Sequence, residues 1–591
     1  MKPELLAPAG SAEALLAAIR CGADAVYLGG GAFNARAGAR NFDRDALEEA
    51  GRLCKSHNVK LYFTLNTLLT DRELPRALAL AEEAIQAGAN AIIVQDLGLL
   101  LRLHEARPDL PLHASTQCST QTAGGMALLK ELGAVRCIVP RECSKEELAA
   151  LVNEALLELE TFVHGALCMS VSGQCLLSHA LGGRSGNRGT CAQPCRLPWA
   201  VDSGQCTMYN YGLSLKDLSL LDEVKKPPLN QMAALKIEGR LKRPEYVAAA
   251  VTAFRHTLDG TASSVFCDDL RRTFSRSGFT QGYYRAQRDK AMFGTRRKED
   301  AAPPETLRRM AALYAKEIPP TCRGGQQATR AQKQSFVSPA GGLLAAPTAR
   351  INEDVLRFLS YEQIPDNVPD NIQIFLPCST PPEILQKNRA QVTIPAGVFG
   401  DYGKVLAQLR RAKEGGASLA MAQTLDGLAL AREAGLVSVA GEGMNVLNSA
   451  SLEALQGLGC AGAVLSAEIT AAQARDLRAQ IAIGAMVYGR LALMLCRNCP
   501  VKSQIGCKAC KNTKNLIDRK GTAFPMRCEN GCAKIYNSRP IWLADVQDKI
   551  PALGFQLFSF TIESREECAK IMRAYQNREA CGGAFTRGWC K

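Results

Sequence analysis

Residues 60–96 contain one complete unit of the fold that the sequence predicts, KLYFTLNTLLTDRELPRALALAEEAIQAGANAIIVQD. Residues 60–65 and 91–94 are short apolar runs of strand length, and residues 74–87 carry apolar side chains at helical spacing. Gly88 follows the helical stretch directly and is a common helix stop. A strand, a helix and a second strand in this order form the crossover that joins parallel strands.

The same alternation covers the first 240 residues. Expected strands lie at 4–7, 25–28, 60–65, 91–94, 112–114, 137–139, 161–163 and 235–237. Eight short strands separated by amphipathic helices predict a (β/α)8 barrel of the TIM type over residues 1–254. A doubly wound open sheet is the alternative α/β fold.

A second series of strands and helices begins near residue 341, with expected strands at 373–376, 391–394, 419–422, 438–440, 463–465, 485–488 and 556–562. It predicts a second barrel-like α/β domain over residues 341–591, complete or incomplete. Residues 255–340 break the pattern and include prolines and Gly324-Gly325, which predicts a connector followed by a linker.

The composition is that of a multidomain globular protein, because 47% of the 591 residues are hydrophobic and 22% are charged. The formal net charge of +14 favours an anionic partner such as RNA. Glu4 interrupts what would be the apolar core of a secretory leader, and no apolar run reaches the length of a membrane span. We therefore expect a cytoplasmic protein with no membrane partner.

Residues 160–195, ETFVHGALCMSVSGQCLLSHALGGRSGNRGTCAQPC, place four cysteines on glycine-rich backbone directly after an apolar run. In reducing cytosol structural disulfides rarely persist, and clustered cysteines more often bind metal. Cys168, Cys175, Cys191 and Cys195 therefore predict a metal or iron–sulfur site, with Cys206 as the reserve ligand if Cys195 points away.

A second group of cysteines lies in a predicted insertion at residues 496–532. The spacing C-x7-C-x2-C-x17-C-x3-C is formed by Cys499, Cys507, Cys510, Cys528 and Cys532. Two closely spaced cysteine pairs across a short hairpin predict a four-thiolate structural site, and zinc is the first candidate. A second iron–sulfur cluster is the alternative, because ligand spacing does not separate the two metals.

Barrels of this kind carry their chemistry where the strands end. Polar side chains follow the expected strands there, with Arg141 after the sixth, His164 after the seventh, and Glu238 and Arg240 after the eighth. His164 is a candidate proton shuttle or a loop-stabilising hydrogen-bond donor. Glu238, like Glu160 at the seventh strand, is either a general base or an anchor for an arginine.

Residues 270–284 alternate cations, aromatic rings and glycines. This composition can stack bases and pair with phosphates, and the candidate RNA-binding residues are Arg272, Arg276, Phe279 and Tyr283. A solvated basic loop is the alternative interpretation of the same stretch.

Residues 160–168 and 173–178 resemble the signature of the peptidase U32 family, a collagenase-like group that includes bacterial RNA-base hydroxylases. Six further segments also resemble blocks of this family: LLAPAG, DAVYLG, LHASTQ, VPRE, LKIEGR and the stretch 274–284. The resemblance therefore covers the whole first barrel. It implies a [4Fe–4S] cluster, loaded by iron–sulfur assembly machinery, on Cys168, Cys175, Cys191 and Cys195.

The resemblance also implies an enzyme that hydroxylates C5 of a pyrimidine in RNA without O2, with prephenate as the hydroxyl donor. A cytidine of 23S rRNA is the first candidate, and uridine 34 of tRNA is an alternative. Arg141 and Arg240 are candidates for binding the two donor carboxylates. Hydroxylation of a small ubiquinone-type aromatic, collagenase-like peptidase activity, and RNA binding without chemistry are the other hypotheses. No HExxH or GxSxG motif supports proteolysis.

Overall fold

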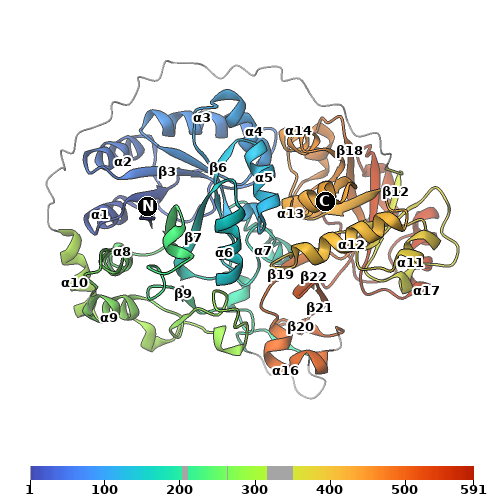
Figure 1. Ribbon diagram of the computed structural model, residues 1–591. Helices are drawn as coiled ribbons and strands as arrows, with labels where there is room; N and C mark the ends of the chain where they lie inside the picture. Colours follow the sequence, from blue (N-terminus) through green and yellow to red (C-terminus); the bar gives the residue numbers. More distant parts are fainter. Residues whose placement is uncertain (1, 203–209, 263, 316–350, 511, 591) are drawn as a thin grey trace.

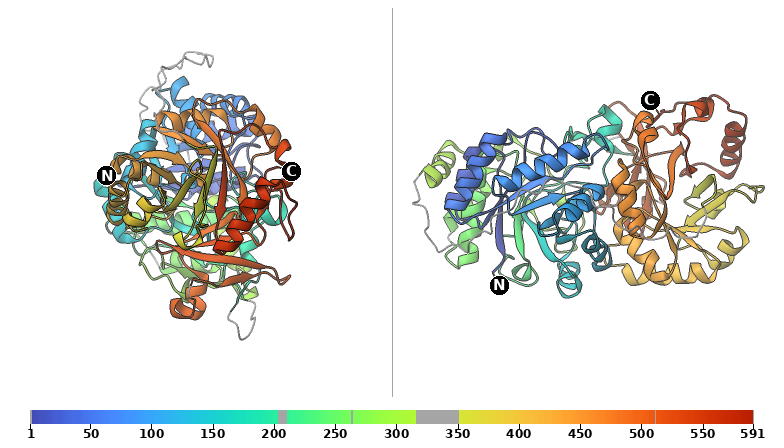
Figure 2. Two further views of the ribbon diagram at one scale, coloured as in Figure 1. Left: turned by 90° about the vertical axis from the view of Figure 1, so that its right-hand side faces the viewer. Right: turned by 90° about the horizontal axis from the view of Figure 1, so that it is seen from above.

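The computed structural model describes residues 2–202, 210–262, 264–315, 351–510 and 512–590. Cys206 and the expected linker at 316–340 lie outside these ranges. Two barrels lie side by side, the first coloured blue to green and the second yellow to red (Figures 1 and 2). Among the described residues, no helix is both long and apolar enough to cross a bilayer.

The first barrel is a closed ring of eight parallel strands, as predicted. Each strand pairs with the next, and the last pairs with both the seventh and the first. The strands are β1 (Glu4–Pro8), β2 (Ala25–Leu28), β3 (Lys60–Leu65), β4 (Ala91–Val94), β5 (Leu112–Ala114), β6 (Ala134–Ile138), β7 (Glu158–Ala166) and β10 (Ala234–Ile237).

Seven helices cover this ring: α1 (Ala12–Arg20), α2 (Arg44–Ser56), α3 (Leu74–Gln86), α4 (Leu97–Ala106), α5 (Ala123–Glu131), α6 (Lys145–Glu154) and α8 (Pro244–Asp259). Local signals explain where several begin and end. Ser11 caps α1 by accepting a hydrogen bond from the Ala14 N–H, and Ser144 with Glu147 forms a capping box on α6. Gly88 ends the turn after α3 at a φ of 102°, which a residue with a side chain rarely adopts.

The second barrel is complete. Its eight parallel strands are β12 (Asp354–Phe358), β13 (Gln373–Pro377), β14 (Gln391–Thr393), β15 (Leu419–Ala422), β16 (Val437–Ala440), β17 (Cys460–Val464), β18 (Ala482–Gly489) and β24 (Phe555–Phe560). β24 closes the ring by pairing with both β18 and β12. Its helices are α11 (Pro382–Lys387), α12 (Tyr402–Glu414), α13 (Leu425–Ala434), α14 (Ser449–Gly457), α15 (Ala471–Asp476) and α17 (Arg565–Gln576).

The connector extends the wall of the first barrel. Strand β9 (Asp217–Ser219) runs antiparallel to the end of β7, and β11 (Phe279–Thr280) pairs with β9. Helices α9 (Ser264–Thr273) and α10 (Pro304–Ala315) pack against α8.

A third, small sheet joins the two halves of the chain. Its strand order is β19 (Ala492–Cys496), β22 (Cys532–Tyr536), β21 (Ala523–Glu529), β20 (Asn515–Ile517) and β8 (Ala200–Val201). β8 belongs to the first half and the other four strands to the second. The sheet lies with α16 (Pro500–Cys510) below the junction of the barrels in Figure 1.

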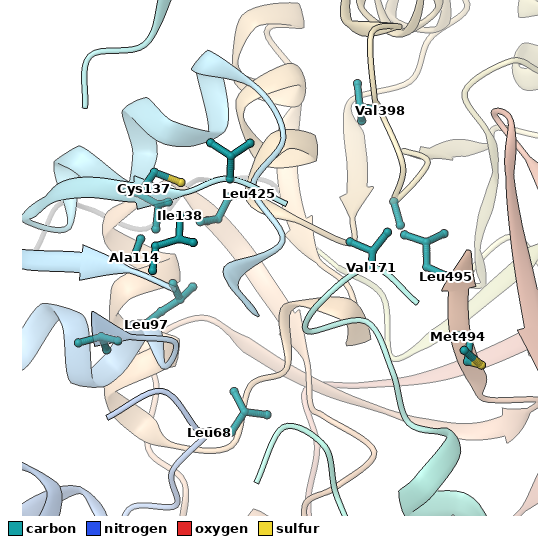
Figure 3. Packing of buried hydrophobic residues seen from close by; sticks show 14 of the residues in the cluster. Leu68, Leu97, Ala114, Cys137, Ile138, Val171, Val398, Leu425, Met494 and Leu495 are labelled. Carbon is teal, nitrogen blue, oxygen red and sulfur yellow. The ribbon is translucent and has the colours of Figure 1, made fainter. Parts of the chain in front are cut away.

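The barrels contact each other through matching helices. α4 packs on α14 and α5 on α13, and these helices follow the fourth and fifth strands of their own barrels. The contact therefore has the pattern of a two-fold axis between similar units. Leu97 and Cys137 of the first barrel belong to the same apolar cluster as Leu425 of the second (Figure 3).

A buried carboxylate marks each half of this contact. Asp96 caps α4 and accepts hydrogen bonds from the Asn448 side-chain amide at 2.9 and 3.0 Å, while Asn448 itself caps α14. Asp426 accepts from the backbone N–H of Gln121 at 2.9 Å and from the backbone N–H and hydroxyl of Thr122, the cap of α5, at 2.9 and 2.7 Å. Both carboxylates thus bind the N-terminal end of a helix in the other barrel.

Replacing Asp426 with alanine should lower the free energy of unfolding by about 2–4 kcal/mol, because buried N–H groups of Gln121 and Thr122 lose their acceptor. Urea denaturation measures the change. The control is Glu414→Ala at the end of α12, whose exposed carboxylate makes no hydrogen bond or ion pair in the described structure and should contribute less than about 0.5 kcal/mol. Equal effects of the two substitutions would contradict the prediction.

Candidate active site and cysteine segment

The carboxyl ends of the first barrel's strands surround a pocket rich in buried cations. Arg36, Arg141, Lys236 and Arg240 line it, and Glu238 is the one carboxylate among the lining residues. We call this cavity the mouth pocket. The excess of positive charge suits an anionic ligand.

Glu238 holds two of these arginines in place. Its carboxylate oxygens lie 3.1 Å from Arg36 Nη2 and 3.3 Å from Arg141 Nη2. Burial raises the pKa of the Glu238 carboxyl, but the charges of Arg36 and Arg141 outweigh it, and the resulting pKa lies below the usual 4.5. Glu238 is therefore ionised at neutral pH. Arg36, which the sequence analysis did not single out, lies far from Glu238 in sequence and has no strand-end signal.

Arg240 is buried among neutral acceptors. It donates hydrogen bonds to Thr64 Oγ1 at 3.0 Å, Asn34 Oδ1 at 3.0 Å and Asn41 Oδ1 at 2.6 Å. Burial lowers the pKa of its guanidinium to about 10, so it remains charged. A Cβ on Gly29 would lie 2.6 Å from Arg240 Nη2, which explains a glycine at that position.

Glu160 lies in the barrel interior and does not line the mouth pocket. Its carboxylate is fully buried and lies 2.7 Å from Lys236 Nζ and 3.5 Å from Arg136 Nη1. These two ion pairs match the anchoring role considered for Glu160 in the sequence. A buried carboxylate needs such partners to remain charged.

His164 also lies away from the mouth pocket. The register of β7 against β10 shifts between Phe162 and His164, which is the effect of a β-bulge. Phe162 therefore lines the pocket, whereas the His164 ring packs against Tyr246, Phe254 and Phe279. Neither ring nitrogen has a hydrogen-bond partner among the described residues, and burial lowers the pKa of His164 to about 3.

The four cysteines of residues 168–195 gather beside the mouth pocket. Cys168 Sγ lies 4.0 Å from Arg141 Nη1. Burial raises the pKa of the Cys175 thiol, and the thiols of Cys195, Cys191 and Cys168 lie close enough to raise it further. Burial also raises the pKa of Cys195 to about 12, with Cys168 and Cys191 again among its neighbours.

The cysteine segment is held by the small sheet. The Val171 N–H donates to Leu495 O and the Leu176 N–H to Leu493 O, both at 2.8 Å, so β19 pairs with residues 171–176. Figure 3 shows Val171 facing Leu495. After Cys195, β8 pairs with β20 of the same sheet. Both flanks of the segment are thus fixed by strands from the second half of the chain.

Comparison with known proteins places this arrangement in a family. The sequence model of peptidase family U32 matches residues 10–293. A collagenase of Porphyromonas gingivalis is 32% identical over 311 residues, which cover 48% of this chain and 74% of that protein. The chain belongs to peptidase family U32.

Two further relatives carry names that refer to RNA. A 23S rRNA 5-hydroxycytidine synthase of Escherichia coli is 37% identical over 286 residues, 48% of this chain and 42% of the relative. A tRNA hydroxylation protein of Bacillus subtilis is 34% identical over 269 residues, 44% of this chain and 63% of the relative. This U32 protein therefore aligns with less than two thirds of either relative.

The expected RNA-binding residues of the U32 protein do not form one surface. Arg272 is exposed, but Arg276 is ion-paired with Asp217 at 2.5 Å and Phe279 packs on His164. Tyr283 is 1% exposed, so its ring has no free face on which a base could stack. The alternation seen in the sequence serves partly to anchor the connector.

The second cysteine group lies around α16 and β21. Cys499 has the thiols of Cys528 and Cys510 nearby, and Cys528 has those of Cys507 and Cys510 nearby. Cys532 is buried instead beside Gly397, where a Cβ would lie 2.5 Å from its Sγ. Within the described part of the chain, no three histidine, cysteine or acidic side chains converge closely enough to hold a single metal ion.

Replacing Glu238 with glutamine should cost about 3 kcal/mol of unfolding free energy at neutral pH, because Arg36 and Arg141 lose a buried counterion. The folded-state pKa of Glu238 is depressed, so its contribution is present above pH 4.5 and is lost as pH falls through the lower folded value. The stability gap between wild type and variant should therefore narrow below pH 4.5. Denaturation at several pH values tests this, and a gap independent of pH would contradict it.

Proposed function

We propose that this U32 protein hydroxylates C5 of a pyrimidine in RNA, with a cytidine of 23S rRNA as the first candidate. The observation that carries the proposal is the gathering of four thiols beside an arginine-lined barrel mouth. The names of the rRNA and tRNA relatives support RNA as the substrate class. The net charge of +14 favours the same class of partner.

The cysteine segment fits a [4Fe–4S] cluster better than a single metal ion. Each thiolate of such a cluster binds a different iron, so the ligands need not converge on one point. Cys168, Cys175, Cys191 and Cys195 would hold the cluster, and Arg141 beside Cys168 would stabilise negative charge there. When bound, the cluster would supply the redox chemistry that C5 hydroxylation needs. Iron–sulfur assembly machinery is then a required partner.

The mouth pocket, about 50 Å³ in volume, has room for a carboxylate group of a donor such as prephenate and not for the whole molecule. The Nε–H groups of Arg141 and Arg240 have no hydrogen-bond partner among the described residues. Carboxylates accept strong charge-assisted hydrogen bonds from guanidinium groups, so two arginines can bind and orient a dicarboxylate. Transfer of the donor's hydroxyl to C5 and of hydrogen to the donor balances without O2. Glu238, as the carboxylate lining the pocket, is the proposed acceptor of the C5 proton.

The geometry does not favour a thiol peptidase. Such an enzyme needs a histidine within hydrogen-bond reach of the nucleophilic thiol. His164 is enclosed by aromatic rings and has no hydrogen-bond partner in the described structure, so it forms no dyad with Cys168.

Mass spectrometry of rRNA and tRNA nucleosides from a deletion strain tests the proposed function. We expect one 5-hydroxypyrimidine to disappear, and its position distinguishes 23S rRNA from tRNA. Complementation with Cys175→Ala should restore neither the nucleoside nor the iron content, whereas RNA affinity should change less than about twofold because cations hold the phosphates. Cys267→Ala, on α9 outside both cysteine groups, is the control and should restore both. Unchanged nucleosides in the deletion strain would refute RNA hydroxylation and favour a small aromatic substrate.

We also propose that Cys499, Cys507, Cys510 and Cys528 hold a structural metal ion, with zinc as the first candidate. Paired thiolates across a hairpin suit zinc, and its binding energy adds directly to folding. The thiols must rotate to converge on one ion, because they do not do so in this structure.

Cys507→Ser should remove the zinc measured in the purified protein and lower its melting temperature, since a structural ion stabilises the fold. Cys581→Ser, a half-exposed cysteine outside this group, is the control and should retain both. Purified wild-type protein that contains no zinc, and no iron beyond the four atoms of one [4Fe–4S] cluster, would contradict this site.

A further inference from the structure

A second cavity, larger than the mouth pocket, lies beside it. Its volume is about 420 Å³, against about 50 Å³ for the mouth pocket. The loop between β10 and α8 forms one wall, and connector residues 273–274, 296 and 301–307 form the others. We call it the side pocket. Its volume lies in the range of small-molecule sites, which is about 300–1,000 Å³.

The side pocket carries unbalanced positive charge. Lys242, Arg243 and Arg296 line it, and none of them has a carboxylate within ion-pair distance in the part of the chain that the structure describes. Glu245 is the acidic residue in the lining, and its carboxylate accepts a hydrogen bond from the Tyr314 hydroxyl at 3.3 Å. Three cations therefore face one carboxylate.

The cations crowd around a single ring. Lys242 Nζ lies 2.9 Å from the centroid of Phe274, and the guanidinium carbons of Arg296 and Arg276 lie 4.8 and 5.4 Å from it. Burial and the charge of Arg276 lower the pKa of Lys242 to about 7, although nearby Asp217 opposes this. Crowding of like charges costs free energy, and a bound anion would offset that cost.

The remaining lining suits a flat organic group. Leu241, Phe274 and Leu307 form an apolar wall beside the cations. Helix α8 begins at Pro244, which has no N–H, and the Tyr246 N–H donates to the Arg243 carbonyl at 3.1 Å, so the side-chain cations and not the helix end would bind an anion. A ligand that combines a negative group with an aromatic or sugar ring matches both parts of the pocket.

One loop connects the side pocket to the mouth pocket. Glu238 lines the mouth pocket, and Tyr246, eight residues later in the chain, lines the side pocket. The Tyr246 hydroxyl donates a hydrogen bond to the Glu238 carbonyl at 2.9 Å. Residues of one loop thus line both pockets.

We propose that the side pocket binds the nucleotide next to the target pyrimidine in the RNA strand. Its phosphate contacts Lys242 and Arg296, and its base or ribose lies on the wall formed by Leu241, Phe274 and Leu307. This inference rests on the proposed function and names the surface that positions the strand. Lys242 and Arg296 act as positioning residues, because neither lines the pocket proposed for the chemistry.

The double variant Lys242→Gln, Arg296→Gln tests the inference. The probe is a short fluorescein-labelled single-stranded RNA of mixed pyrimidines, and its anisotropy is measured at several salt concentrations. We expect affinity at least about tenfold weaker at low salt, and a slope of log affinity against log salt that is shallower by about 0.7, the value for the one phosphate that is no longer neutralised. The control Lys404→Gln, Arg411→Gln removes the same charge from the exposed face of α12 and should change neither quantity.

Four further measurements make the result decisive. Arg296→Gln alone alters an exposed residue, so it should fold and show about half of the change in slope. Iron content should be unaffected in all variants, and Lys242→Arg should retain the wild-type slope. Inorganic phosphate should compete with RNA only at concentrations far above those of RNA, whereas tight competition would show a site for free phosphate and overturn the proposal.

The two proposals fail in different ways. If the wild-type protein modifies RNA but the double variant binds and modifies it with unchanged affinity and salt slope, the side pocket is not a nucleotide site and this inference is wrong. If the wild-type protein neither modifies nor binds RNA, the proposed function fails, and the side-pocket inference fails with it.

Discussion

Backbone pairing between residues 171–176 and β19 ties the cysteine segment to the second half of the chain, and the site depends on it. The segment is rich in glycine, and between β7 and Cys195 its regular structure is limited to α7 (Leu177–Gly182) and the short 3-10 turn that begins at Pro194. Its thiols are positioned because Val171 and Leu176 bond to Leu495 and Leu493. The second half of the chain is therefore part of the architecture of the first barrel's mouth and not an independent appendage.

The balance of charge differs between the top of the first barrel, where the carboxyl ends of its strands surround the mouth pocket, and the barrel interior. In the interior, Glu160 is matched by Lys236 and Arg136, as buried charges require. At the top, Glu238 balances Arg36 and Arg141, and Arg240 has neutral partners. Beside it, Lys242 and Arg296 share the ring of Phe274. Interior charge is thus neutralised within the protein, whereas positive charge exceeds negative charge at the mouth.

The period and length of the apolar runs were sufficient to predict the first barrel and seven strands of the second. The missed strand, β12, is short and carries Arg357, whose partner Glu442 lies at 2.7 Å from a distant part of the chain. The direction of His164 could not be predicted, because it depends on a bulge that leaves no signal in composition. Tyr283 resembled a stacking residue in the sequence, and only packing shows that it is buried. The side pocket was equally hidden, since Lys242 and Arg296 are distant in sequence.

The small sheet imposes an order on the making of the protein. β8 ends at Val201 and its partner β20 begins at Asn515. At roughly 5–20 residues per second, ribosomes need about 15–60 s to synthesise the chain between them. During that interval the first barrel can close, but the thiols that follow β7 have no strand to hold them. These thiols therefore reach their final positions only after residues 492–517 have been synthesised and have paired with the first half of the chain.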